Sequence, residues 1–122
     1  MRRKNKIEKL LKRMLIAKTR NTEKINEISY NELINIMMNN NDITIIDVRS
    51  PQEFKEGKIR YAINIPLYNL KEQIRLEKLN KNNTIVLYCQ YGERSKKAYN
   101  ILKQNGFKNV FSLRGGLDSI SN

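Results

Sequence analysis

From position 25 onward, short apolar runs alternate along the chain with stretches that have helical periodicity. The short runs have the length and composition of buried strands, and they cover 25–28, 43–46, 62–65, 84–88 and 109–113. Between them, apolar residues recur at helical spacing over 29–38, 67–79 and about 95–104. Because strands and helices alternate, the pattern predicts an α/β fold with a largely parallel sheet.

Two of the predicted helices begin with recognisable capping residues. Ser29 is followed three positions later by Glu32, and Ser50 by Glu53. This is the spacing of a capping box, in which each side chain accepts a hydrogen bond from the other residue's backbone N–H. Pro51 also suits the first position of the second helix. We therefore expect a short helix to begin directly after the strand that ends near residue 47.

The first 24 residues form a different kind of segment. Apolar residues recur on one helical face over 5–18, and Lys and Arg residues lie mostly off that face. Residues 19–24 have the composition of a linker. The pattern predicts a basic amphipathic helix and linker over 1–24, followed by a single domain over 25–122, which matches the length of one domain.

Charge is concentrated in this first segment. Residues 1–24 carry ten basic and two acidic residues, a net charge of +8, whereas residues 25–122 contribute only +4 of the total of +12. A local basic excess favours a protein partner or an anionic one such as nucleic acid or a lipid surface. The alternatives are that the helix packs on its own domain, or that it is an ordinary solvated basic helix.

Composition narrows the chemistry and the compartment. The chain has one cysteine and no histidine, so it has no internal disulfide, and most general-base mechanisms and zinc sites are excluded. A reducing, cytoplasmic location fits, and we expect neither a metal nor a cofactor. No run approaches the roughly 20 apolar residues of a membrane span. Lys18 and Arg20 interrupt the short apolar run near the start, which argues against a signal peptide.

The cysteine occupies a position where reactive groups are common. Cys89 directly follows the apolar run 84–88 and precedes a predicted helix, and sites in parallel sheets form beyond the carboxyl ends of strands. Backbone N–H groups of the loop, the helix N-terminus and Arg94 all favour a thiolate there. Gly92 supplies the freedom that a tight loop needs. The alternative is a buried structural cysteine, but a core position does not require this loop composition.

Several segments together resemble the rhodanese family, over about residues 25–120 and in the family's order. Val86 to Ser95 is similar to its active-site loop, Cys-x-x-Gly-x-Arg-Ser. The other matching segments are 47–54 with 56–59, 62–66, and 106–110 with 113–117. The resemblance implies a small parallel five-stranded sheet flanked by helices. It also implies sulfur transfer, in which a cysteine takes sulfur from a donor such as thiosulfate and passes it to cyanide or a thiol.

Carried onto this chain, the resemblance makes Cys89 the persulfide carrier. Arg94 would then bind the negative charge of the donor. Backbone N–H groups of the loop would cradle the anionic sulfur, and the residues concerned are Gln90, Tyr91, Gly92, Glu93, Arg94 and Ser95. Cys89 to Arg94 spans six residues, the length typical of the family's sulfurtransferases, whereas related phosphatases and arsenate reductases have one residue more.

Other positions are open to two interpretations. Asp47 and Arg49 are candidate supporting residues, although a structural role is favoured, with Arg49 paired to a carboxylate such as Glu53. Glu93 would partly offset Arg94 and disfavour anionic donors unless it points outward. Lys58 replaces a histidine common in the family, and the position of Leu117 is often tryptophan.

Three other functions compete with the sulfurtransferase. A persulfide relay to a partner, for example in tRNA thiolation, would use the basic segment to dock RNA or protein, but that segment has no aromatic residue to stack on bases. A non-catalytic recognition module is disfavoured because Cys89, Gly92 and Arg94 are all present. Loop length and the lack of a second cysteine argue against a phosphatase or an arsenate reductase.

Overall fold

The computed structural model describes residues 8–9, 25–39 and 42–120. Its strands are β1 (Glu27–Ile28), β2 (Ile43–Asp47), β3 (Ile63–Asn64), β4 (Thr84–Tyr88) and β5 (Val110–Leu113). Its helices are α2 (Tyr30–Asn39), α3 (Pro51–Glu56), α4 (Leu70–Arg75) and α5 (Glu93–Gln104), with 3-10 turns η1 (Leu67–Asn69) and η2 (Leu117–Ile120). The strands form one parallel sheet in the order β1-β5-β4-β2-β3, which confirms the predicted fold class.

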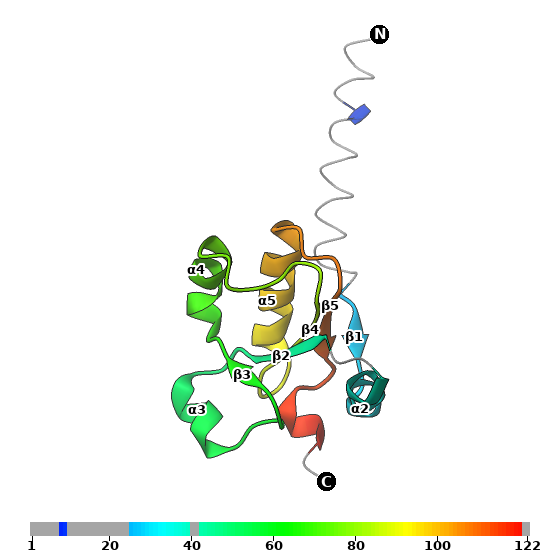
Figure 1. The fold of residues 1–122 in the computed structure, drawn as a ribbon, viewed down its shortest axis with the longest axis vertical. Coiled ribbons are helices and arrows are strands. Elements are labelled where there is room, and N and C mark those ends of the chain that lie inside the picture. Colours follow the sequence, from blue (N-terminus) through cyan, green and yellow to red (C-terminus); the bar gives the residue numbers. More distant parts are fainter. Residues whose placement is uncertain (1–7, 10–24, 40–41, 121–122) are drawn as a thin grey trace.

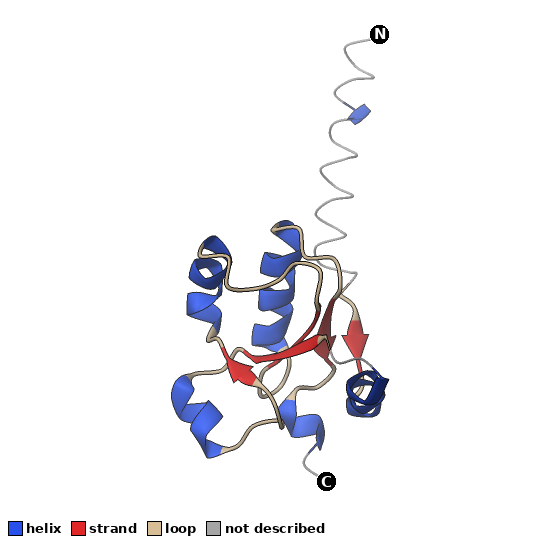
Figure 2. Cartoon of the chain, in the orientation of Figure 1, coloured by secondary structure: helices blue, strands red, loops and turns tan. Residues whose placement is uncertain are grey.

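Helices cover both faces of this sheet. Figures 1 and 2 show α4 and α5 on one side and α2, α3 and η2 on the other. Successive residues of a strand point to opposite faces, and β4 follows this rule. Its Ile85 and Leu87 join the α5-side core, and Val86 and Tyr88 join the α2-side core. A strand buried on both faces explains why 84–88 is a continuous apolar run.

The predicted helix over 67–79 is wrong in its extent. It is a 3-10 turn over Leu67–Asn69 followed by α4, which ends at Arg75. Leu70 and Ile74 are four residues apart and pack into the core, but Leu76 is 44% exposed because it falls off that face. The chain then turns through Glu77, whose φ is 55°.

The other predicted elements agree with the structure to within one or two residues. The β4 boundaries are as predicted, and both capping boxes form around Ser29 and Ser50. Helix α5 begins two residues before the predicted Ser95, and η2 was not predicted. The helix and linker predicted for 1–24 lie outside the described residues, apart from Glu8 and Lys9.

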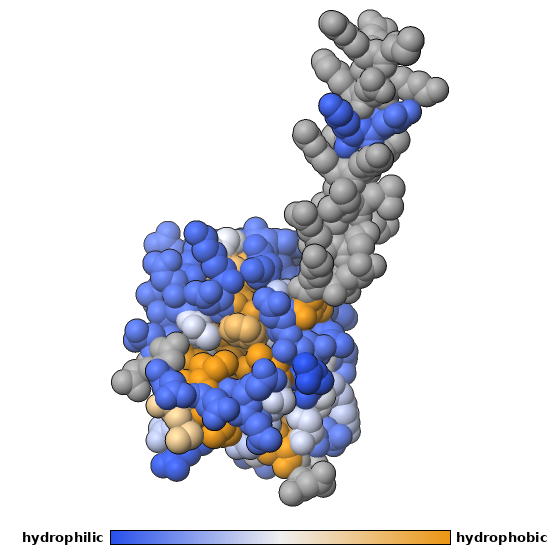
Figure 3. Space-filling view, turned by 90° about the vertical axis from the view of Figure 1, so that its right-hand side faces the viewer, coloured by the Kyte–Doolittle hydropathy of each residue, from blue (hydrophilic) through white to orange (hydrophobic). Residues whose placement is uncertain are grey.

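The described surface carries apolar patches in a mostly polar setting. Figure 3 shows such a patch on the side of the molecule that lies to the right in Figure 1. The surface also has a shallow groove of about 400 Å³, which is lined by Asn35, Ile36, Asn39, Thr84 and Phe111. Because Thr84 begins β4 and Cys89 follows its end, this groove lies at the far end of the strand from the cysteine. No helix within 8–9, 25–39 and 42–120 is long and apolar enough to cross a membrane.

Candidate active site

The candidate site lies at the carboxyl ends of two adjacent strands. Asp47, the last residue of β2, is the register partner of Tyr88, the last residue of β4. Cys89 comes directly after β4 and is completely buried in the α5-side core. The loops after β2 and β4 therefore lie side by side, and each leads into a helix.

The thiol of Cys89 takes the place of a side-chain cap for α5. Gly92 is the N-cap residue of this helix and has no side chain to provide a cap. Instead, its N–H donates to Cys89 Sγ at 3.0 Å, and the N–H of Ser95, three residues further on, donates at 3.4 Å. Gly92 has a φ of 115°, which an L side chain rarely adopts. The sulfur therefore accepts from N–H groups at the start of α5 that have no partner within the helix, and α5 begins at Glu93.

Arg94 is paired with a carboxylate from the neighbouring helix α3. Its two terminal nitrogens bind the Glu53 oxygens at 2.6 and 3.0 Å. The bidentate guanidinium holds the pKa of Glu53 at about 2, and Glu53 in turn raises the pKa of Arg94. Arg49 does pair with a carboxylate, as expected, but its partner is Asp47 and not Glu53. Arg94, which the sequence predicts to bind the donor, forms an ion pair with Glu53 in the structure. Its positive charge also interacts electrostatically with Cys89.

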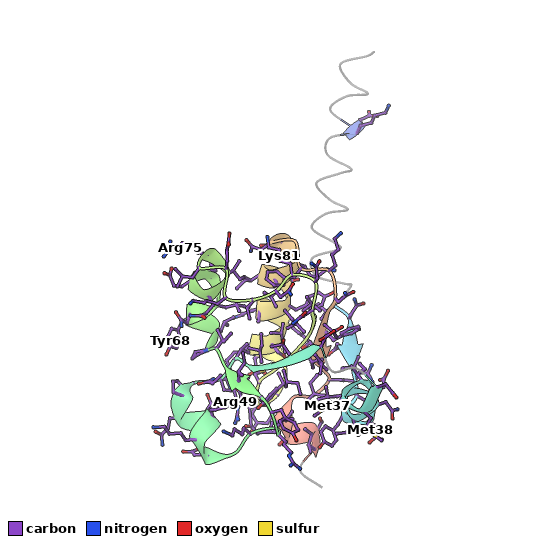
Figure 4. All side chains as sticks on the ribbon, viewed as in Figure 1. Met37, Met38, Arg49, Tyr68, Arg75 and Lys81 are labelled. Carbon is purple, nitrogen blue, oxygen red and sulfur yellow. The ribbon has the colours of Figure 1, made fainter. Side chains whose placement is uncertain are left out.

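Arg49 pairs with Asp47, two residues away on its own loop. Asp47 is completely buried, and Arg49 is 3% exposed. The guanidinium Nε contacts both carboxylate oxygens, and one terminal nitrogen bonds Asp47 at 2.7 Å. The other bonds the side-chain oxygen of Gln90 at 3.2 Å. Arg49, labelled in Figure 4, lies between α3 and η2 in that view. This pair therefore supports the loop after Cys89 through Gln90.

The chain near its C-terminus supports the loop from the other side. Leu117 N–H donates to the carbonyl of Cys89 at 2.8 Å, and Asp118 N–H to that of Gln90 at 2.9 Å. A Cβ atom on Gly116 would lie only 2.5 Å from the Gln90 carbonyl oxygen. The sequence predicted a turn at 114–117, but not that this turn holds the cysteine loop.

The sequence also left Ser112 out of the site. This β5 residue is completely buried, and its hydroxyl lies 2.8 Å from the hydroxyl of Ser95. Ser95 Oγ is in turn 3.7 Å from Cys89 Sγ. A lone serine within the apolar run 109–113 was the available signal, because a buried hydroxyl needs a partner.

The remaining predicted residues lie around the loop. Tyr91 is 64% exposed, and Glu93 points outward, with a side chain that is 61% exposed. The Lys58 ammonium lies 4.4 Å from the ring centroid of Phe54. Leu117 is half-buried against the α2-side core. Within the described residues, the hydrogen bonds of the Cys89 sulfur are made with Gly92 and Ser95 instead.

The fold and the site together define a class of protein: a parallel α/β domain that holds one buried thiol at the N-terminus of a helix. The family model of the rhodanese-like domain matches residues 29–122. The chain belongs to the rhodanese-like family.

Relatives share this part of the chain. A sulfurtransferase of Allochromatium vinosum is 33% identical over 93 residues, which cover 76% of this chain and 85% of that protein. A tRNA uridine(34) hydroxylase of Buchnera aphidicola is 38% identical over 88 residues, 69% of this chain. That match spans only 28% of the hydroxylase, so the two proteins share one part of the larger one.

Solved structures of the same family have a similar fold. A rhodanese-related protein from Thermoplasma volcanium superposes with a TM-score of 0.68 at 31% identity, covering 77% of this chain and 88% of that one.

Proposed function

We propose that this protein is a sulfurtransferase, which carries a sulfane sulfur as a persulfide on Cys89. The observation that supports this most is the pair of backbone N–H groups, from Gly92 and Ser95, that point at Cys89 Sγ. They stabilise a negative sulfur without a general base, which suits a chain that has no histidine. The loop of six residues from Cys89 to Arg94 has the length typical of the family's sulfurtransferases.

The reaction has two steps. The Cys89 thiolate attacks the outer sulfur of a donor such as thiosulfate, a new S–S bond forms, and sulfite leaves with the electron pair of the broken S–S bond. A thiophilic acceptor then attacks the outer sulfur of the persulfide. Cyanide leaves as thiocyanate, a thiol leaves as a persulfide, and the Cys89 thiolate is regenerated. Cys89 is completely buried, so Sγ has to become accessible before a donor can react with it.

The charges around the loop favour a second candidate for the donor and acceptor. Arg94 and Arg49 are each paired with a carboxylate, so part of the positive charge that would attract a doubly charged thiosulfate is already balanced. A donor with less charge, such as a low-molecular-mass persulfide or a protein persulfide, suits this balance. Tyr91, exposed beside Cys89, offers a contact for a macromolecule. The likeness to a tRNA uridine(34) hydroxylase supports a relay toward a tRNA-modifying partner.

The decisive experiment is intact-mass spectrometry of the full chain after incubation with excess thiosulfate, and separately with a low-molecular-mass persulfide. A gain of about 32 Da that cyanide removes is expected. Cys89→Ser is the matched control, because it keeps a hydrogen-bond acceptor for the two N–H groups but cannot form a persulfide. An adduct from the persulfide alone favours the relay, and salt-dependent binding of RNA by the full chain would then support an RNA partner. No adduct from either donor contradicts both candidates.

A further inference from the structure

Ser112 is a polar residue in an apolar position of the sheet. It pairs in register with Leu87 of β4, and its neighbour Val110, two residues earlier, packs in the α5-side core. By the alternation of a strand, Ser112 points to the same face, beneath α5. The residue is completely buried. A hydroxyl there is costly unless it is hydrogen-bonded.

The bond that Ser112 makes leads to the reactive sulfur. Among the described residues, Ser112 Oγ is hydrogen-bonded to Ser95 Oγ, at 2.8 Å. Ser95 Oγ also donates to the Gly92 carbonyl oxygen at 3.0 Å and accepts from the Cys89 thiol, with 3.7 Å between Oγ and Sγ. The two hydroxyls therefore form a chain from β5 to Cys89.

Counting protons fixes the direction of this chain. Each hydroxyl has one proton to donate and two lone pairs that accept. Either hydroxyl could donate in the bond between Ser95 and Ser112, but Ser95 donates its proton to the Gly92 carbonyl, so Ser112 is the donor to Ser95. The single proton of Ser95 is then left for the Gly92 carbonyl or for Cys89 Sγ. When Cys89 is a thiol, the nearer carbonyl takes it, and when Cys89 is a thiolate, the charge-assisted bond to sulfur is stronger.

We infer that Ser112 is a positioning residue for Cys89: it donates to Ser95 and so directs the single Ser95 proton toward the sulfur when the sulfur is negative. A hydroxyl that accepts one hydrogen bond is also a better donor of the next. This inference deepens the proposed function, because it rests on Cys89 as the reacting group. It assigns a role to a residue outside the loop.

Other charged groups around Cys89 are untouched by changes at Ser112. Arg94 on α5 acts electrostatically on the thiolate and is held by Glu53 on α3. Glu93 is largely exposed, and the Arg49–Asp47 pair reaches the loop through Gln90. A change in thiolate formation on substitution of Ser112 therefore reports the hydroxyl chain.

The test measures the rate of Cys89 alkylation by iodoacetamide against pH, by intact mass, in the full chain with its single cysteine. Ser112→Ala is expected to move the midpoint of the profile upward by about half a pH unit, which is about threefold slower alkylation well below the midpoint. Ser112→Thr and Ser112→Val form a matched pair of nearly equal shape. The Thr variant should keep the wild-type midpoint, and the Val variant should shift it as Ala does.

Two results would overturn the inference. One is an unchanged midpoint in Ser112→Ala, or equal shifts in the Thr and Val variants, which would assign the effect to packing. The other is a shift of the same size when Ser112→Ala is made in a Ser95→Ala background, where the chain is already broken and no further shift is expected. Persulfide formation by the wild type is measured separately. Its absence with an intact Ser112 effect rejects the proposed function alone, and its presence without that effect rejects the role of Ser112 alone.

Discussion

The β2–α3 and β4–α5 turns are built alike but use their helix N-termini differently. In the first, Ser50 and Glu53 bind each other's backbone N–H groups, so the start of α3 is satisfied by its own side chains. In the second, the N-cap is Gly92, which has no side chain, and Cys89 Sγ accepts the N–H bonds instead. In the first turn the backbone N–H groups are satisfied by the turn's own side chains, whereas in the second the N–H groups of Gly92 and Ser95 point at one sulfur atom.

This difference shows how one local device serves two purposes. The positive end of a helix favours any negative group placed on its free N–H groups. In α3 that group is part of the cap itself, Glu53, and the same carboxylate reaches across to hold Arg94. The β2–α3 turn therefore supports the β4–α5 turn through this ion pair. In α5 the group is the thiol, so the strength of the cap depends on the charge of the sulfur.

The largest effect on stability is expected from a substitution of Gly116, which lies against the β4–α5 turn. Gly116→Ala would place a Cβ 2.5 to 2.6 Å from the backbone of Cys89 and Gln90, and should lower the free energy of unfolding by about 3 kcal/mol. Gly115→Ala is the matched control. It has a similar positive φ, but its Cβ would meet only the Ser119 side chain, at 3.1 Å. We expect a loss of about 1 kcal/mol there, measured by urea unfolding. Equal losses in the two variants would contradict the role of Gly116.

Removing each cap should give the next largest effect and compares the two turns directly. Ser50→Ala is expected to cost about 1 kcal/mol, the usual loss for a helix cap at a partly exposed site. Cys89→Ala should cost more, about 2 kcal/mol, because it leaves the buried N–H groups of Gly92 and Ser95 without an acceptor. Cys89→Ser should recover part of this loss. If Ser and Ala at position 89 unfold alike in urea, the sulfur does not act as the cap of α5.

The smallest effect concerns the ion pair that links the two turns. Glu53 has a pKa of about 2, lowered from 4.5 mainly by its bonds to Arg94. The stabilisation that ionised Glu53 contributes to the free energy of unfolding is therefore complete above pH 4.5, and it is lost as the pH falls toward 2. Glu53→Gln keeps the capping box, so the stability gap to the wild type should be below about 1 kcal/mol at pH 7 and should narrow from pH 4.5 downward.

The control for this pH dependence is Glu72→Gln. Glu72 pairs with Arg75 on the surface, where the two side chains are 48% and 68% exposed. Urea unfolding at several pH values should give a smaller gap for this variant. A gap for Glu53→Gln that stays constant down to pH 3 would contradict the ion pair as its cause.

Prediction from sequence succeeded where the signal is local. The run 84–88 is apolar throughout because β4 is buried on both faces, and the capping box at Ser50 needs only residues close in sequence. The helix over 67–79 failed because its C-terminal end was decided by packing: Leu79 returns to the core only after the chain turns at Glu77. Arg49 pairs with a carboxylate as expected, but with Asp47 and not Glu53, because sequence spacing does not show which nearby carboxylate a guanidinium faces.

The sequence by itself determined the α/β class, the strand that ends just before Cys89 and the loop of six residues from Cys89 to Arg94, because periodicity and spacing depend only on residues close in sequence. Only the tertiary structure decided which distant groups meet at the sulfur. Glu53 reaches Arg94 across 41 positions, and Ser112 reaches Ser95 across 17. These contacts exist because parallel pairing brings the carboxyl ends of β2, β4 and β5 to one edge of the sheet, and no local pattern records which side chains then face one another.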